Sequence, residues 1–179
     1  MDQDDFWATI ERARALGGPL HEALETVLAD MPAEAIVDYR QRYDEHRTAL
    51  NRWDVWAAAY LIGGGCGDDS FMDFRAGVIA QGRECHRIAL TGPDRLADLP
   101  LVLAGDGEDL FYEDFTYAPA NAYRRVTGDD GLFAAQRERH PQRLDEPDMG
   151  EDFDFDDPAE MRRRLPRLAA LFLDDSPRA

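Results

Sequence analysis

Residues 53–90 read WDVWAAAYLIGGGCGDDSFMDFRAGVIAQGRECHRIAL, and this stretch decides the fold. Its first part is apolar on most sides, which predicts a buried helix over about 52–62. The glycines at 63–65 end that helix, and apolar residues then recur at helical spacing over 68–90. We therefore expect a central helix-turn-helix hairpin over about 52–90, used for packing and not for reading DNA.

Two glycines, Gly77 and Gly82, fall inside the second predicted helix of this hairpin. A glycine within a helix costs about 1 kcal/mol relative to alanine. A close approach by a neighbouring helix would offset that cost, and we expect the face at 57–59, which is all alanine, to be the neighbour.

Outside the hairpin the same periodicity predicts further helices. The expected helices before the interruption at Pro119 cover about 4–16, capped by Asp4 or Asp5, 20–28 and 33–50. The pattern is helical again over 108–125, but Pro119 interrupts it and opens a new helix at 118–126, and a last helix over 158–173 is kinked or split at Pro166. The 33–50 helix carries charged residues on its remaining faces, so it is predicted to be an outer, amphipathic helix. No strand-type alternation is long enough for a sheet, so the fold class is all-α, a single-domain bundle of about seven to nine helices.

The length of 179 residues suits one domain. We expect a helical core over 1–143, an acidic loop or linker over 144–157, and a C-terminal helix over 158–173 that docks on the core. The loop is predicted because residues 145–157 hold eight acidic and no basic side chains.

The formal net charge of −17 narrows the class of partner. Such a surface repels phosphate backbones, so direct nucleic-acid binding is not expected, whereas a basic partner, a cation or simple solubility is favoured. The sequence has no apolar run near the ~18 residues of a transmembrane helix and no secretory signal. Cys66 and Cys85 are therefore expected to be free thiols in the cytoplasm. All 20 basic residues are arginine, a bias typical of a high-GC bacterial genome.

Several motifs along the chain resemble one protein family. They are Phe6-Trp7, the run from Gly64 to Asp69, the group Phe71, Phe74 and Arg75, Gly82-Arg83, and the stretch from Arg163 to Leu168 after an acidic tract. The pattern is similar to the domain-of-unknown-function family DUF4240, a bacterial and mainly actinobacterial family. At Gly67 the family pattern has serine, so a hydroxyl that caps a helix or contacts a ligand is lacking here. The resemblance implies no assigned activity.

Asp68 and Asp69 follow the glycines and precede the second hairpin helix. Aspartate is among the best N-caps, so the structural interpretation is that at least one of them caps this helix. The functional interpretation makes Asp69 an acid, base or ligand, and lets the pair hold Mg²⁺ through waters. No cofactor is predicted apart from this divalent cation.

Arg75 has two interpretations as well. It forms an internal ion pair with Asp54, Glu84 or Glu113, or its planar fork holds a carboxylate or phosphate. The candidates for lining a ligand pocket are Glu84, Glu113, Asp68, Trp56 and Tyr60, the last two through their polar ring atoms. An aromatic stripe such as Trp53, Trp56 and Tyr60 is, however, more often part of a hydrophobic core.

Cys66 stands just before a helix N-terminus, where a thiol can act as a nucleophile with a base such as His86; a lone cysteine is more often inert. The cysteines and histidines lack zinc spacing, so no metal site is predicted from them. The glycine run lacks the preceding strand and the Gly-Lys-Ser/Thr of a phosphate-binding loop.

Three hypotheses for function follow. The first is a non-catalytic binding or adaptor module for a protein partner or a small-molecule ligand. The second is a small enzyme or accessory factor of bacterial metabolism, with its site at the 66–75 turn: Asp69 and Arg75, with Cys66 as nucleophile. The third is an acidic nucleic-acid mimic or inhibitor acting through the surface charge and the 145–157 tract.

Overall fold

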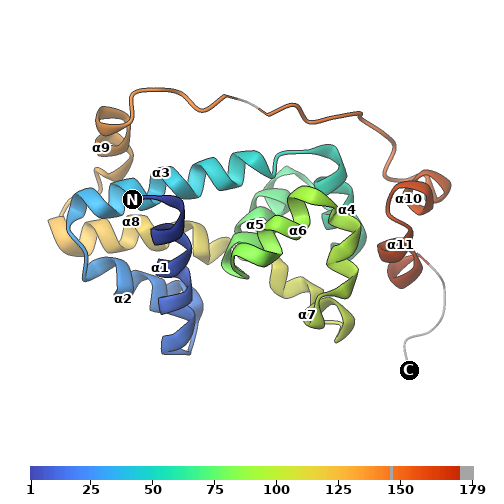
Figure 1. The fold of residues 1–179 in the computed structure, drawn as a ribbon, viewed down its shortest axis with the longest axis horizontal. Helices are drawn as coiled ribbons and strands as arrows, with labels where there is room; N and C mark the ends of the chain where they lie inside the picture. Colours follow the sequence, from blue (N-terminus) through green and yellow to red (C-terminus); the bar gives the residue numbers. More distant parts are fainter. Residues whose placement is uncertain (146, 174–179) are drawn as a thin grey trace. The chain divides into compact units, whose positions relative to one another are not determined.

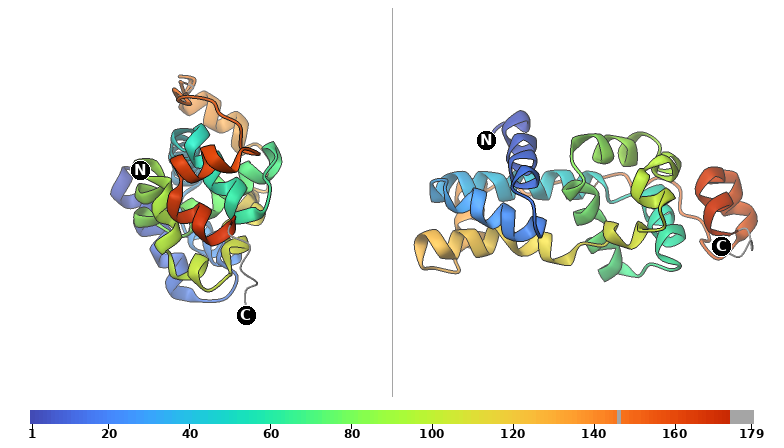
Figure 2. Two further views of the ribbon diagram at one scale, coloured as in Figure 1. Left: turned by 90° about the vertical axis from the view of Figure 1, so that its right-hand side faces the viewer. Right: turned by 90° about the horizontal axis from the view of Figure 1, so that it is seen from below.

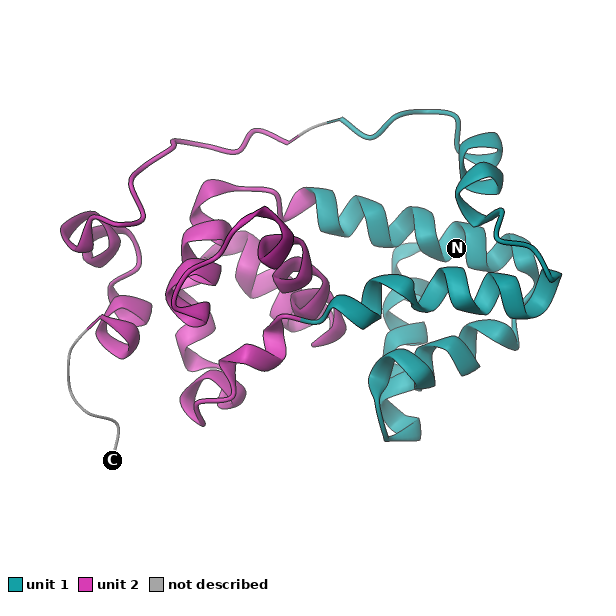
Figure 3. Ribbon diagram, turned by 180° about the vertical axis from the view of Figure 1, so that it is seen from behind, with its two compact units in different colours: residues 1–48, 112–146 teal, residues 49–111, 147–179 magenta. Residues whose placement is uncertain are grey.

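The computed structural model describes residues 1–145 and 147–173, and every regular element in this part of the chain is a helix (Figure 1). The predicted all-α class is confirmed. The chain divides into two compact units: unit 1 comprises residues 1–48 and 112–146, and unit 2 comprises residues 49–111 and 147–179 (Figure 3). The predicted boundaries near 143 and 157 stay a prediction. No helix among the described residues has both the length and the apolar character needed to cross a membrane.

Unit 1 is organised around its third helix. Its α-helices are α1 (Gln3–Leu16), α2 (Leu20–Ala29), α3 (Ala33–Ala49), α8 (Glu113–Thr127) and α9 (Leu132–Arg139). In Figure 2, right, α1 runs across α3, and the ring of Phe6 lies 4.9 Å from that of the fully buried Tyr39. One turn further along α3, the ring of Tyr43 lies 6.1 Å from that of Phe115 of α8.

The prediction that this helix is an outer one was wrong. Charged residues on it do not all face solvent: Arg40 is only 5% exposed. Its Nε and Nη2 donate to the two carboxylate oxygens of Asp44, at 3.0 and 2.8 Å, and Nη1 donates to the carbonyl of Thr116. An arginine can be buried when its donors are satisfied in this way.

Two predicted helix starts in unit 1 also need correction. Asp2, and not Asp4 or Asp5, caps α1, in a capping box in which the Asp2 and Asp5 side chains accept each other's backbone N–H. Helix α8 begins at Glu113, and Pro119 lies inside it without ending it. A proline removes one intrahelical hydrogen bond, and the burial of Pro119 in the core of unit 1 offsets that loss.

Unit 2 contains the predicted hairpin. Its helices are α4 (Trp53–Gly63), α5 (Asp68–Ala80), α6 (Arg83–Thr91), α7 (Pro100–Leu103), α10 (Pro158–Arg164) and α11 (Pro166–Phe172), with the 3-10 helices η1 (Pro93–Asp98) and η2 (Gly107–Leu110). Ala57, Ala58 and Ala59 are fully buried, as expected for the central helix α4.

The predicted single helix over 68–90 is two helices, because the chain turns at Gly82. This residue has φ = 96°, a conformation that favours glycine, and it stands directly before α6. Gly77 does mark a close approach, but the neighbour is not the alanine face of α4. A Cβ on Gly77 would lie 1.9 Å from the carbonyl oxygen of Leu110, so η2 is the element that needs the glycine.

The C-terminal part of unit 2 lies against its hairpin. The amide of Trp53 donates to the carbonyl of Met149 at 3.0 Å, and the Phe155 ring lies 5.6 Å from that of Tyr60. The last helix is split at Pro166, as predicted, and α11 packs against η1 and α4 with Leu168 fully buried.

Candidate functional site

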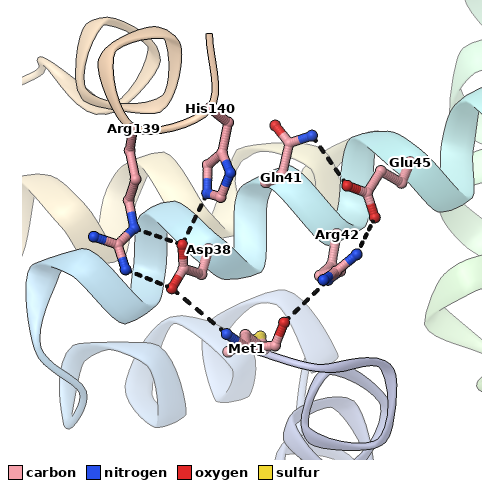
Figure 4. Close-up of a pocket in the computed structure, with 7 residues that line it drawn as sticks. All are labelled: Met1, Asp38, Gln41, Arg42, Glu45, Arg139 and His140. Carbon is pink, nitrogen blue, oxygen red and sulfur yellow. Dashed lines mark hydrogen bonds and ion pairs between the residues drawn. The ribbon is translucent and has the colours of Figure 1, made fainter. Parts of the chain in front are cut away.

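A hollow of about 420 Å³ lies in unit 1 beside α3 (Figure 4). Three elements supply its side chains: the start of the chain, α3, and the end of α9 with the residue that follows. The lining residues are Met1, Asp38, Gln41, Arg42, Glu45, Arg139 and His140. In Figure 4 their polar groups converge on one another from these elements.

Asp38 holds one wall of this hollow together. Its carboxylate accepts two hydrogen bonds from the Arg139 guanidinium, Nε at 2.6 Å and Nη2 at 3.0 Å, and the amine of Met1 lies 3.5 Å away. Nε2 of His140 lies 2.8 Å from Asp38 Oδ1. Since an ionised carboxylate only accepts hydrogen bonds, this ring nitrogen is the one that carries the proton.

The protonation states of this wall are fixed by these contacts. The hydrogen bonds from Arg139, assisted by His140, hold the pKa of Asp38 well below its ordinary value, although partial burial acts in the opposite direction. The same pairing raises the pKa of Arg139. Asp38 and Arg139 therefore stay ionised at neutral pH.

The opposite wall is built on the next turns of α3. Glu45 accepts from Arg42 at 2.6 Å and from Gln41 at 3.1 Å, and Arg42 Nε donates to the carbonyl of Met1. Gln136 of α9 in turn donates to the Gln41 side chain at 3.1 Å. Helix α9 is thereby tied to α3 along both walls.

A second hollow, of about 450 Å³, adjoins the first. It shares four lining residues, Gln41, Glu45, Arg139 and His140, and extends along residues 141–145. Arg143 lies there with an exposed side chain, and within the described residues it forms no hydrogen bond or ion pair.

The candidates predicted from sequence at the 66–75 turn lie in unit 2. Gly67 occupies the N-cap position of α5 without a side-chain cap, so neither Asp68 nor Asp69 caps the helix, and both are exposed in its first turn. The predicted cap was wrong because α5 already begins at Asp68, which puts both aspartates inside the first turn and Gly67 at the N-cap.

Cys66 is half-buried in the same turn. Burial raises the pKa of its thiol to about 11, so the thiol is protonated at neutral pH. Its carbonyl accepts a hydrogen bond from the indole Nε1 of Trp56 at 2.9 Å.

Arg75 belongs to a stack of side chains. Its guanidinium carbon lies 4.6 Å from the centre of the Phe71 ring, which stacks on Trp56 at 4.6 Å and 9°; Trp56 stacks on Trp53 at 5.5 Å and 10°. The adjacent Tyr60 donates its hydroxyl hydrogen to Asp156. The structure thus brings Trp56, Cys66 and Arg75 into one cluster.

The remaining candidates have other roles. Glu84 on α6 pairs with Arg87 at 2.6 Å, Asp54 pairs with Arg52 at 2.7 Å, and Glu113, in unit 1, accepts from Tyr117 at 2.9 Å. In the described part of the chain, no group of three or more histidine, cysteine, aspartate or glutamate side chains is arranged to hold a metal ion.

The hollow in unit 1 was missed from the sequence. Asp38, Arg42 and Glu45 share a face of α3 by their spacing, and this mixture of charges was interpreted as a solvated surface. The partners of Asp38, Arg139 and His140, stand about a hundred residues later, so no local pattern links them.

The comparisons with known proteins bear on the family alone. No curated protein and no solved structure matches the chain. A family model does match residues 1–125, which includes α3 but neither α9 nor the stretch from Arg163 to Leu168. The match covers more than half of the sequence, and the chain belongs to the family described as "Protein of unknown function (DUF4240)".

Proposed function

We propose that this protein is a non-catalytic binding module and that the hollow beside Asp38 is its binding site. The observation that carries the proposal is the arrangement of Asp38 with Arg139, His140 and the Met1 amine around a hollow of about 420 Å³. Such prearranged hydrogen-bonding groups are what a polar binding site needs, because little order has to be created when the ligand arrives.

The protonation states favour binding over catalysis at this site. A general acid or base works best when its pKa lies near the operating pH. The pKa values of Asp38 and Arg139 are moved in the opposite directions, away from neutrality. Asp38 and Arg139 therefore stay charged and fixed in place, and they do not act as proton donors or acceptors.

The alternatives draw less support. A nucleophilic role for Cys66 needs a thiolate, and its pKa of about 11 opposes that. A lure at the acidic 145–157 tract draws on its free carboxylates, and two of the eight acidic side chains are already engaged, since Glu151 pairs with Arg164 and Asp156 accepts from Tyr60. We also propose a bacterial cytoplasmic location, which agrees with the free thiols of Cys66 and Cys85.

The test is a thermal-shift screen with small anionic, neutral polar and cationic compounds. We expect at least one class to raise the melting temperature of the wild type, because a ligand at 100 times its Kd stabilises by about 2.7 kcal/mol. The shift should disappear in Arg139→Gln. It should persist in Arg137→Gln, which removes an exposed arginine of the same helix that does not line the hollow. A shift that survives Arg139→Gln, or no shift with any class, would refute the proposal.

A further inference from the structure

We infer that the ligand class of this site is a small oxyanion, a phosphate or carboxylate group, bound by Arg139, which lines both hollows, with Arg42 in the first hollow and Arg143 in the second. The inference rests on the proposed function and names the chemistry that the two adjoining hollows recognise.

The arginines of the two hollows keep N–H donors that their described contacts do not use. Arg139 uses Nε and Nη2 for Asp38, which leaves Nη1. Arg42 uses Nε for the Met1 carbonyl and Nη1 for Glu45, which leaves Nη2. Arg143 has its whole guanidinium available among the described residues. A guanidinium offers five N–H donors in a planar fork that matches an oxyanion.

Both carboxylates of the first hollow are already occupied, while the second hollow adds the exposed Asp145. Asp38 is only 14% exposed and accepts from Arg139 and His140, and Glu45 accepts from Arg42 and Gln41. A cationic ligand would have to displace a bidentate guanidinium from Asp38. An oxyanion needs no such displacement, because it meets unused N–H groups.

The overall charge of −17 opposes the approach of an anion at long range. At physiological ionic strength the Debye length is about 8 Å, so distant carboxylates on the surface are largely screened. Hydrogen bonds from guanidinium groups in direct contact are screened much less. The local donors therefore decide the sign of the preference.

Asp38 is a positioning residue in this account. By accepting from Nε and Nη2 of Arg139 and from His140, it fixes both side chains at the wall of the hollow. Removing its charge should therefore weaken anion binding, although a simple count of charges predicts that losing a carboxylate strengthens it. The direction of this change in affinity therefore distinguishes binding at a prearranged site from attraction by the overall charge.

The experiment is calorimetric titration of the full chain at about 0.15 M salt, with inorganic phosphate in one arm and succinate in the other. We expect saturable binding of at least one of them to the wild type. Arg143→Ala should weaken it by about tenfold, the scale of one lost charge-assisted hydrogen bond. Arg143 is exposed and lacks a described partner, so this variant should fold normally.

Matched variants make the result decisive. Arg137→Ala removes an exposed arginine from outside both hollows and should bind like the wild type; Asp38→Asn should bind more weakly. Equal weakening in Arg137→Ala, tighter binding in Asp38→Asn, or no saturable binding of either anion would overturn the inference. If a neutral or cationic compound then still stabilises the wild type through Arg139, the proposed binding function stands and only the oxyanion assignment fails.

Discussion

The hollow of unit 1 and the aromatic cluster of unit 2 are each stabilised by a different kind of contact. In unit 1 the hollow depends on charged hydrogen bonds such as those between Asp38 and Arg139, two residues that are 101 positions apart in sequence. In unit 2 the central cluster depends on stacked rings at Trp53, Trp56 and Phe71 and on close backbone contacts at Gly77. Changes of charge and pH should therefore act on the hollow of unit 1, and changes of side-chain volume on the aromatic cluster of unit 2.

The largest effect is expected from Gly77→Ala in unit 2. The new Cβ would lie 1.9 Å from a backbone oxygen of η2, which cannot move aside as a flexible side chain can. We expect a loss of at least about 3 kcal/mol in unfolding free energy, measured by urea denaturation. Gly67→Ala is the control, because nothing lies within 4 Å of its added Cβ. Equal stability of the two variants would contradict the close contact.

In unit 1, Asp44→Ala should be nearly as damaging. It leaves the guanidinium of Arg40, whose side chain is 7% exposed, without its bidentate partner. Breaking a buried pair from one side costs about 3 kcal/mol. The matched change is Glu84→Ala in unit 2, which breaks an exposed pair with Arg87 and should leave the denaturation midpoint unchanged. Similar losses in both variants would show that burial does not distinguish the two pairs.

The contribution of the ionised Asp38 to the stability of unit 1 should depend on pH. Since its pKa is lowered on folding from an ordinary value of 3.8, the ionised carboxylate stabilises the fold above about pH 4. That contribution is lost as the pH falls from about 4 toward the lowered pKa. Urea denaturation of Asp38→Asn should therefore show a deficit against wild type at pH 7 that narrows below pH 4. A deficit that stays constant would mean that the charge of Asp38 is not its cause.

The smallest expected effect is a gain in unit 2 from Gly67→Ser. Gly67 stands at the N-cap of α5 with φ = −80°, a conformation open to any residue, and makes no side-chain cap. A serine hydroxyl there can accept a backbone N–H of the first turn, worth a few tenths of a kcal/mol over glycine. A rise of the thermal midpoint is expected, and a fall would show that the loop needs glycine.

The sequence predicted helix ends well where apolar periodicity stops at a run of glycines or at a proline. The buried helix ending at Gly63 and the split at Pro166 follow from local rules. The break at Gly82 was interpreted as a close contact inside a helix, because a glycine that packs and a glycine that turns look alike in sequence. The neighbour of Gly77 was missed because η2 lies about thirty residues further along.

The candidate site was much less accessible from sequence. The aromatic residues of 53–71 form a local cluster, so their pattern pointed to that turn. The hollow of unit 1 joins α3 to α9 through side chains such as Asp38 and His140, which are individually ordinary surface residues. Only the folded chain brings them together. A charged helix face looks the same in sequence whether it lines a hollow or faces solvent.

The three tryptophans of the chain are divided between the units, with Trp7 in unit 1 and Trp53 and Trp56 in unit 2. Because the latter two are nearly parallel at 5.5 Å, their electronic transitions should couple and give a near-ultraviolet circular dichroism signal. Trp7 instead lies beside the His46 ring, at 4.7 Å between centres. The protein thus carries a separate intrinsic optical probe in each unit, and a Trp7→Phe variant would report on unit 2 alone.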